Sequence, residues 1–150
     1  MSTTYTIGQV STALNIPSST LRYYDKLHFL PHLKKSASGI RQFDQADIDT
    51  IRIIECLKLA GLSIKEIQQF TQMLAEGDAS LAKRQQFFHQ IRQNFIQKLT
   101  QMQQTLAVLD FKCAYYDQAA ADGTEALVQK NMSLSSVIPD QPALPTNSPA

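Results

Sequence analysis

The segment that decides the fold reads Thr20-Leu21-Arg22-Tyr23-Tyr24-Asp25, and a second motif, Ser38-Gly39-Ile40-Arg41-Gln42-Phe43, follows it after a basic loop. Pro17 fits the start of a helix, and the hydroxyls at positions 18–20 can satisfy the unpaired amides there. The residues therefore predict a cationic, aromatic helix over about 18–27, followed by a cationic turn. Together the two motifs suit a surface that holds a phosphate backbone.

A shorter helix is predicted before this one. Thr6 and Gln9 form a capping-box pattern, and the apolar residues that follow share one helical face as far as Leu14. Asn15-Ile16-Pro17 then leaves only a tight connection to the next helix. Two short helices joined in this way make a helix-turn-helix.

In a helix-turn-helix the second helix lies in the major groove of DNA, with its first residues nearest the base edges and its basic and hydroxyl groups near phosphates. Leu21 and Tyr24 are expected to belong to the core. The candidate DNA contacts of this helix are Ser18, Ser19, Thr20, Arg22, Tyr23 and Lys26.

The distribution of charge supports a nucleic-acid partner. Residues 1–43 hold five basic side chains against one acidic side chain, a net charge of +4, whereas the remaining residues carry nine basic and 12 acidic side chains, a net charge of −3. A basic region that coincides with a helix-turn-helix is the electrostatic signature of DNA binding. Lys34, Lys35 and Arg41 therefore join the candidate DNA contacts.

Length and composition limit the other possibilities. A chain of 150 residues with 43% hydrophobic content can bury one small core. The N-terminus has no signal pattern, and no segment approaches the roughly 20 apolar residues of a membrane span, so the chain is expected to remain in the cytosol, away from membranes. Cys56 and Cys113 are too few for a disulfide scaffold and are expected to be thiols.

Two further helices are predicted after the basic region. Asp44 caps a helix over about 45–60, and Gly61 ends it. Ser63 then opens the next helix. Apolar residues occupy most of the circumference of the first of these helices, which is therefore expected to be enclosed on several sides. They are Ile48, Ile51, Ile53, Ile54, Cys56, Leu57 and Leu59.

A single long helix is predicted from about Ser80 to Ala121. Its apolar residues recur three or four residues apart, and they are Phe88, Ile91, Phe95, Leu99, Met102, Leu106, Leu109, Cys113, Tyr116 and Ala120. From Leu99 onward the steps alternate as in a heptad seam, with one stutter between Phe95 and Leu99. A helix of about 42 residues would extend about 63 Å, far beyond what a small head can cover. A partner chain must cover the rest. After Gly123 the periodicity is lost and prolines accumulate, so the tail is expected to be disordered.

The order of these motifs resembles the MerR family of transcriptional regulators. The resemblance rests on the segment at 20–25, the wing closed by residues 39–43, the pair Ala60-Gly61 before a fourth helix, and the long terminal helix. His28 departs from the family pattern, which usually has glycine there to end the recognition helix. Histidine can adopt the left-handed conformation that such an ending needs, but it is strained there. The expected fold class is all-α, with a winged helix-turn-helix head at 1–75, a coiled-coil dimerisation helix at 76–122 and a disordered tail at 123–150.

The resemblance implies a homodimer joined by an antiparallel coiled coil, with two heads on an inverted-repeat operator in double-stranded promoter DNA. Members of the family distort the DNA on activation so that RNA polymerase can use the promoter. In this resemblance Arg22 and Tyr23 correspond to backbone contacts of the recognition helix, and Arg41 corresponds to the wing contact.

The resemblance also bears on the signal. Metal-sensing members have a cysteine at the start of the long helix, where this chain has Asp78-Ala79-Ser80, and the tail has neither cysteine nor histidine, so no metal site and no cofactor are expected. About 29 residues follow the long helix, too few for a multidrug pocket. The surroundings of Cys56 are similar to a subfamily (NmlR/AdhR-like) that responds to aldehydes and other electrophiles through one cysteine.

Alternatives to this interpretation remain open. Cys56 could be a structural residue, because free cysteine is often only packed in the core. Cys113 is interpreted as packing on the seam, with pairing to Cys56 of the other subunit as an alternative. The chain could respond to another signal or be an unregulated DNA-binding protein. An enzyme is disfavoured, because His28, His32 and His89 lie in unrelated contexts and no nucleophile–base pair is evident.

Overall fold

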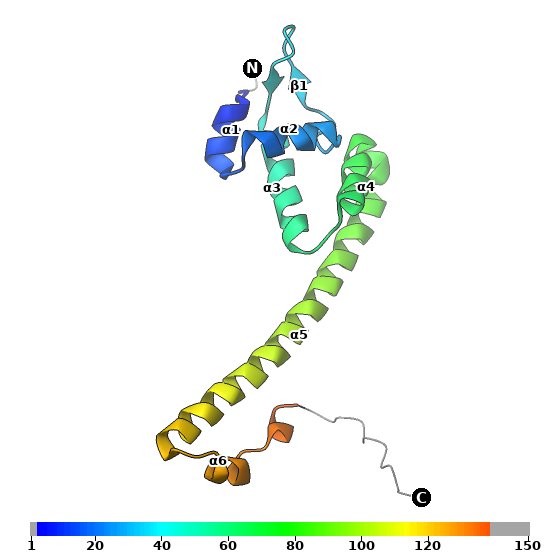
Figure 1. Ribbon diagram of the computed structural model, residues 1–150. Helices are drawn as coiled ribbons and strands as arrows, with labels where there is room; N and C mark the ends of the chain where they lie inside the picture. The colour runs from blue at the N-terminus through cyan, green and yellow to red at the C-terminus, as the bar shows by residue number, and fades with distance from the viewer. Residues whose placement is uncertain (1–2, 139–150) are drawn as a thin grey trace, which may run out of the picture. The chain divides into compact units, whose positions relative to one another are not determined.

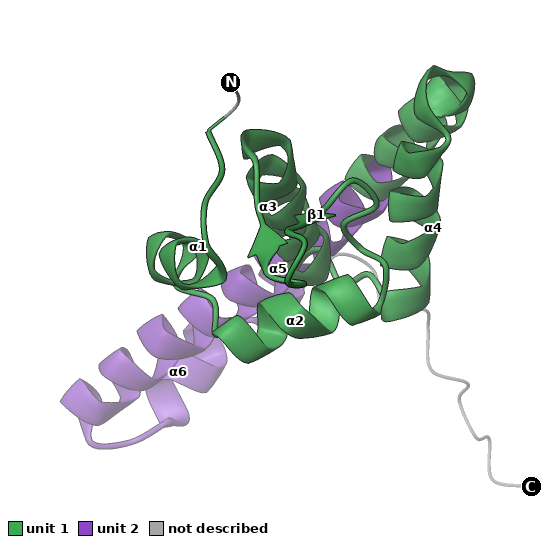
Figure 2. Ribbon diagram, turned by 90° about the horizontal axis from the view of Figure 1, so that it is seen from above, with its two compact units in different colours: residues 1–92 green, residues 93–150 purple. Residues whose placement is uncertain are grey.

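The computed structural model describes residues 3–138 and confirms the predicted class, a helical protein with a small wing (Figure 1). Two compact units divide within the long helix, after Arg92 (Figure 2). The helices are α1 (Ile7–Leu14), α2 (Ser18–Lys26), α3 (Gln45–Leu59), α4 (Ile64–Ala75), α5 (Leu81–Asp122) and α6 (Ala126–Asn131). Two short strands, β1 (Lys34–Lys35) and β2 (Arg41–Gln42), and two 3₁₀ turns, η1 (Gly77–Ser80) and η2 (Leu134–Ser136), complete the described chain.

The helix-turn-helix forms as predicted. Thr6 and Gln9 make the reciprocal capping box of α1, and Asn15 ends that helix in the left-handed conformation, at φ 53°. Ile16 is buried, and Pro17 occupies the N-cap of α2. The predicted capping of α2 by side chains is wrong, because no side chain caps this helix. Pro17 has no side-chain acceptor at the N-cap position, and residues 18–20 already lie within the first turn of the helix.

The wing is an antiparallel hairpin between α2 and α3. Lys34 pairs with Gln42 and Lys35 pairs with Arg41, and Gly39 turns the chain at φ +83°. At the base of the wing, the backbones of Tyr5 and Phe43 exchange two hydrogen bonds of 2.7 and 3.0 Å. The strained histidine that the sequence predicted is present, because His28 has a φ of 60° where α2 ends and the path to the wing begins.

One hydrophobic core holds the head together. Its buried side chains come from both helices of the helix-turn-helix, the wing base, α3 and α4, and they are Val10, Ile16, Leu21, Tyr24, Phe29, Leu30, Phe43, Ile51, Ile54, Leu57, Ile67 and Phe70. Phe87 and Ile91, in the first turns of α5, pack against the same core. The rings of Phe70 and Phe87 stack with centroids 5.8 Å apart. The start of the long helix is therefore part of the head.

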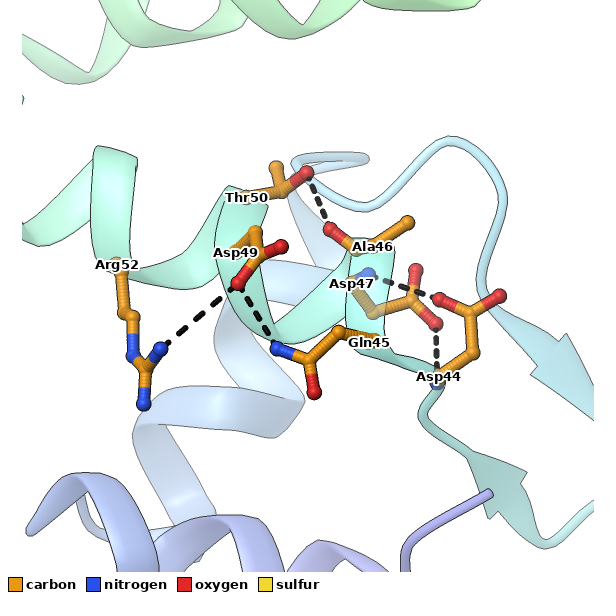
Figure 3. Close-up of polar contacts among 7 residues, drawn as sticks. All are labelled: Asp44, Gln45, Ala46, Asp47, Asp49, Thr50 and Arg52. Atoms are coloured by element: carbon orange, nitrogen blue, oxygen red, sulfur yellow. Dashed lines mark hydrogen bonds and ion pairs between the residues drawn. The ribbon is translucent and has the colours of Figure 1, made fainter. Parts of the chain in front are cut away.

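The start of α3 is tied by a set of short-range polar contacts (Figure 3). Asp44 accepts a hydrogen bond from the Asp47 amide at 2.9 Å, and Asp47 accepts one from the Asp44 amide at 3.0 Å. Burial raises the pKa of Asp47, and the neighbouring Asp44 carboxylate adds to the rise. Further along, Asp49 accepts from Gln45 and lies 3.8 Å from Arg52 on the exposed side of the helix.

The expectation that α3 is enclosed on several sides is wrong for the single chain. Ile51 and Ile54 are fully buried, but Ile53 is 38% exposed, Leu59 is 87% exposed and Cys56 is also exposed. Helical periodicity separates the two sets onto different faces. The apolar residues of α3 did not indicate by themselves which face of the helix packs against the rest of the same chain.

A set of hydrogen bonds connects the end of α4 to the start of α5. Ser80 is completely buried, and its hydroxyl contacts the carbonyl oxygens of Met73 and Gly77. Arg84 donates from Nε to the Ser80 hydroxyl and from Nη2 to the Gly77 carbonyl, both at 2.9 Å. Ser80 therefore has a structural role at this junction.

The second unit contains the rest of α5 and a short returning segment. Val128 of α6 is buried against Tyr115 and Ala119 of α5, and the Tyr115 hydroxyl donates to Glu125 at 2.9 Å. The expectation of a disordered tail from residue 123 is therefore wrong as far as residue 138, because α6 finds an apolar face on α5. Residues 139–150, the rest of that predicted tail, lie outside the described residues.

The predicted seam of α5 is exposed in the single chain. In the second unit the seam residues Phe95, Leu99, Met102, Leu106, Leu109 and Tyr116 are between 45% and 69% exposed. The segment containing α6 covers Phe111, Tyr115 and Ala119 instead, which lie on another face of the helix. Across residues 3–138, no helix is long and apolar enough to cross a membrane.

Candidate nucleic-acid interface

The cationic side chains of α2 and the wing line one groove. Its volume is about 720 Å³, and its walls are Ser19, Arg22, Tyr23, Asp25, Lys26, His28, Lys35 and Arg41. The helix contributes the first five of these residues, and the two strands contribute the last two. The groove therefore joins the two motifs from which the sequence predicted a phosphate-binding surface.

A single carboxylate links the helix to both strands. Oδ2 of Asp25 accepts a hydrogen bond from Nε of Arg41 at 2.8 Å and lies 3.1 Å from Nζ of Lys35. The Asp25 side chain is 16% exposed, whereas that of Lys35 is 48% exposed. The carboxylate is thus more buried than the two basic side chains that contact it.

The ionisation of Asp25 follows from these neighbours. Burial alone would raise its pKa, but the hydrogen bonds and charges of Arg41 and Lys35 outweigh burial and hold the pKa below its usual range. A carboxyl group with a lowered folded-state pKa contributes stability above its unfolded-state pKa and loses it as the pH falls through the folded-state value. The link is therefore fully ionised at neutral pH.

The structure brings together most, but not all, of the DNA contacts predicted from the sequence. Ser19, Arg22, Tyr23, Lys26, Lys35 and Arg41 line the groove, whereas Ser18, Thr20 and Lys34 do not. Ser18 and Thr20 are half-buried at the start of α2, and Lys34 is exposed on β1. Because side chains alternate along a strand, Lys34 and Lys35 point to opposite sides of the wing.

Two groove residues were not among the predicted contacts. Asp25 carries the wrong charge for a phosphate contact, although its position as the single acid in residues 1–43 was visible in the sequence. His28 was noticed only for its backbone conformation. Both were missed because their place depends on how the wing folds over α2.

A second polar link, on the inner side of α2, joins this helix to α3. The buried Tyr24 hydroxyl donates to Glu55 and accepts from Lys58 Nζ at 2.7 Å. Burial raises the pKa of Tyr24, and the hydrogen bond to Glu55 raises it further. The hydrogen bond to Tyr24 in turn raises the pKa of Lys58. Tyr24 is thus a core residue, as expected, with its polar end anchored on the helix that carries Cys56.

Replacing Tyr24 with phenylalanine should lower the free energy of unfolding by about 1 kcal/mol, because the change removes the shared hydroxyl but leaves the ring in the core. Glu55 and Lys58 are partly exposed and can recover water, which limits the loss. Urea denaturation of parent and variant at one protein concentration measures it. Tyr23→Phe, at a side chain that is 46% exposed, is the control and should change stability by less than about 0.5 kcal/mol. Equal stability of the two variants would contradict the structural role of the Tyr24 hydroxyl.

Neither cysteine is covered by the rest of the single chain. Cys56 on α3 and Cys113 on α5 are free and exposed. Cys56 follows Glu55 directly, yet it faces away from the core stripe of α3. Within residues 3–138, no group of three or more histidine, cysteine, aspartate or glutamate side chains is arranged to hold a metal ion.

Comparison with known proteins identifies the architecture. Residues 5–74 match the family described as MerR HTH family regulatory protein. An HTH-type transcriptional regulator of Haemophilus influenzae is 31% identical over 121 residues, which cover 81% of this chain and 90% of that protein. The chain belongs to the MerR family. It is a DNA-binding transcriptional regulator with a winged helix-turn-helix head.

Further relatives support the narrower resemblance. The HTH-type transcriptional regulator AdhR of Bacillus subtilis is 36% identical over 91 residues, 61% of this chain and 65% of that protein. A crystal structure of HiNmlR, described as a MerR family regulator lacking the sensor domain and bound to promoter DNA, superposes with a TM-score of 0.74 at 30% identity, covering 82% of this chain and 98% of that one. A MerR family regulator from Listeria monocytogenes superposes equally well, with 28% identity over 85% of this chain and 96% of the other. This MerR protein therefore resembles the NmlR/AdhR-like members.

Arg22→Ala should weaken binding to all DNA sequences alike and reduce the slope of log affinity against log salt concentration by about one unit, as the loss of one phosphate contact does. Arg22 is exposed on α2 and lines the groove. Fluorescence anisotropy titrations at several salt concentrations measure the slope. Lys83→Ala removes one positive charge from an exposed position of α5 and serves as the control, with an unchanged slope. A parent-like slope for Arg22→Ala would exclude this residue as a phosphate contact.

Proposed function

We propose that this MerR regulator is a homodimer that binds an inverted-repeat operator within a promoter. It activates transcription by distorting the DNA, and it does so when a reactive aldehyde or another electrophile modifies Cys56. The observation that carries the sensing part is the exposed thiol of Cys56 on α3. The same helix is anchored to the recognition helix through Tyr24. A covalent change on α3 therefore occurs on an element that contacts the DNA-reading helix.

Support for the homodimer comes from the exposed seam of α5. Large apolar side chains recur along one face over many turns, and a monomeric soluble protein rarely leaves such a surface uncovered. Heptad spacing makes a second copy of the same helix the fitting cover. Two heads joined in this way would present two copies of the groove to two half-sites, which suits an inverted repeat.

The positions of the side chains suggest which of them contact phosphates and which contact bases. The groove cations are proposed to hold phosphates, while Ser18 and Ser19 at the start of α2 are proposed to approach base edges. Substitutions at these serines should therefore change which operator bases are preferred. RNA polymerase at the same promoter is the proposed partner that responds to the distorted DNA.

The chemistry of the proposed switch is thiol addition to a carbonyl group. The Cys56 thiolate forms a sulfur–carbon bond to the aldehyde carbon, the carbonyl π bond breaks, and the oxygen takes a proton to give a hemithioacetal. The reaction needs no oxidant, metal or cofactor. Because the thiol is exposed in the single chain, access is not limited by the head's own core.

Transcription in vitro tests the proposal directly. The purified full-length protein, its promoter on a linear template and RNA polymerase are combined with and without methylglyoxal. The expected result is more transcript after treatment, with operator occupancy in a footprint nearly unchanged and altered cleavage at the centre of the site. Equal transcript with and without methylglyoxal would leave a DNA-binding regulator whose Cys56 is structural or whose signal is different.

A further inference from the structure

We infer that Asp25 is the positioning residue that fixes the wing against the recognition helix and thereby sets the preference for operator over other DNA. The inference rests on the proposed contact of the groove with DNA. It concerns a residue whose charge would by itself oppose that contact.

The geometry gives Asp25 control over two elements at once. A single oxygen, Oδ2, holds Arg41 of β2 at 2.8 Å and Lys35 of β1 at 3.1 Å. Lys35 and Arg41 are also paired with each other across the two strands, so the carboxylate contacts both strands at the same residue pair. One side chain of α2 therefore determines where the hairpin lies over the helix.

The wing needs such an anchor because it is small. Each strand has two residues, and an isolated two-stranded hairpin is marginally stable at best in water. Phe43 ties down the base of the wing through its buried ring and its backbone pairing with Tyr5. Residues 37–40 of the turn are exposed. Between this base and tip, the contact with Asp25 is the ion-paired link from the wing to α2 in the described part of the chain.

Electrostatics alone disfavour a carboxylate at the position of Asp25. A carboxylate inside a groove for phosphates repels the ligand and neutralises part of the two nearby cations. Its removal should raise attraction to any DNA, because the net charge of the groove rises by one. The compensating gain is preorganisation, since a wing already held in place does not have to be ordered when the operator binds.

One experiment distinguishes the effect of Asp25 on the charge of the groove from its effect on the position of the wing. Asp25→Asn keeps the size of the side chain and removes its charge. Full-length parent and variant are titrated with two duplexes, one selected by the parent from a random-sequence library and one scrambled to the same composition. We expect the ratio of selected to scrambled affinity to fall about tenfold or more, while affinity for the scrambled duplex stays equal or rises.

A matched control carries the same charge change outside the groove. Asp49→Asn removes an exposed carboxylate of α3 that contacts Gln45 and Arg52 (Figure 3). Asp49 is not among the residues that line the groove. It should change both affinities equally and leave their ratio at the parent value. If Asp25→Asn behaved in the same way, with both duplexes binding more tightly in equal proportion, the positioning role would be overturned.

Hydrogen exchange of the free protein provides a readout that general destabilisation does not reproduce. Amides of residues 34–42 should exchange faster in Asp25→Asn, while those of residues 51–57 in α3 keep their parent protection. If the asparagine variant loses protection in α3 as well, Lys35→Met replaces it, since this change releases one strand and leaves the Asp25–Arg41 contact. Unchanged wing exchange and an unchanged affinity ratio in Lys35→Met would then overturn the inference.

Failure of the inference and failure of the proposed function give different results. A parent protein that enriches no duplex from the library would reject operator binding itself. A parent with a clear preference that Asp25→Asn retains would reject only the role of Asp25.

Discussion

Leu106→Asp should convert the protein from a dimer to a monomer. Leu106 is 55% exposed in the single chain and lies on the proposed seam of α5. In a coiled-coil dimer the substitution would bury two unpaired carboxylates, each costing about 3–5 kcal/mol, so the dissociation constant should rise by at least about a thousandfold. Sedimentation equilibrium at micromolar concentration measures the change. The monomer should also lose most of its operator affinity, because it has a single head and cannot bind both half-sites as a linked pair.

Gln103→Asp controls for the charge itself. Gln103 is exposed on the same helix but does not belong to the seam, so a carboxylate there should stay in water and leave the dimer intact. Two results would reject the seam as the dimer interface: a parent protein that sediments as a monomer, or a Leu106→Asp variant that sediments like the parent.

Cys56→Ser should abolish induction by aldehydes and other electrophiles while leaving the fold, the dimer and operator binding intact. Oxygen replaces sulfur in a side chain of similar size, but a hydroxyl is not ionised at neutral pH and does not add to these compounds in the same way. A reporter fused to the promoter that the protein binds measures induction with formaldehyde, methylglyoxal or a quinone. Mass spectrometry of the treated parent should place the adduct on the peptide that contains Cys56.

Cys113→Ser is the matched control, because both thiols are free and exposed in the single chain. The Cys113 variant should retain induction. If Cys56→Ser responded as strongly as the parent, the sensor assignment would be rejected and Cys56 would be a structural residue. If both serine variants lost induction and the oxidised parent showed a cross-linked dimer on a non-reducing gel, a disulfide between the two positions would replace the single-cysteine mechanism.

Local chemistry explains why the helices could be placed from the sequence. Thr6, Asp44 and Ser63 each begin a helix through a capping box, whose partners lie only three residues away. Gly61 and His28 end elements in left-handed conformations for equally local reasons. The helix-turn-helix followed from such signals, and the long helix followed from apolar periodicity. The wing was expected from the resemblance to the MerR family, which the comparisons confirm.

Tertiary structure decided which faces are covered and which charges meet. The sequence marked Arg22 and Arg41 as cations, but only the folding of the wing over α2 shows that Arg41 is shared with Asp25. It likewise showed apolar residues over most of the circumference of α3, whereas the fold leaves the face with Cys56 exposed in the single chain. The prolines near the end of the chain suggested disorder, yet α6 begins where Val128 can bury itself against Tyr115. Capping and periodicity act within a few residues, so the sequence alone determined helices α1 to α5. Burial and ion pairing join residues far apart along the chain, so only the assembled fold could determine the covered faces and the charge contacts.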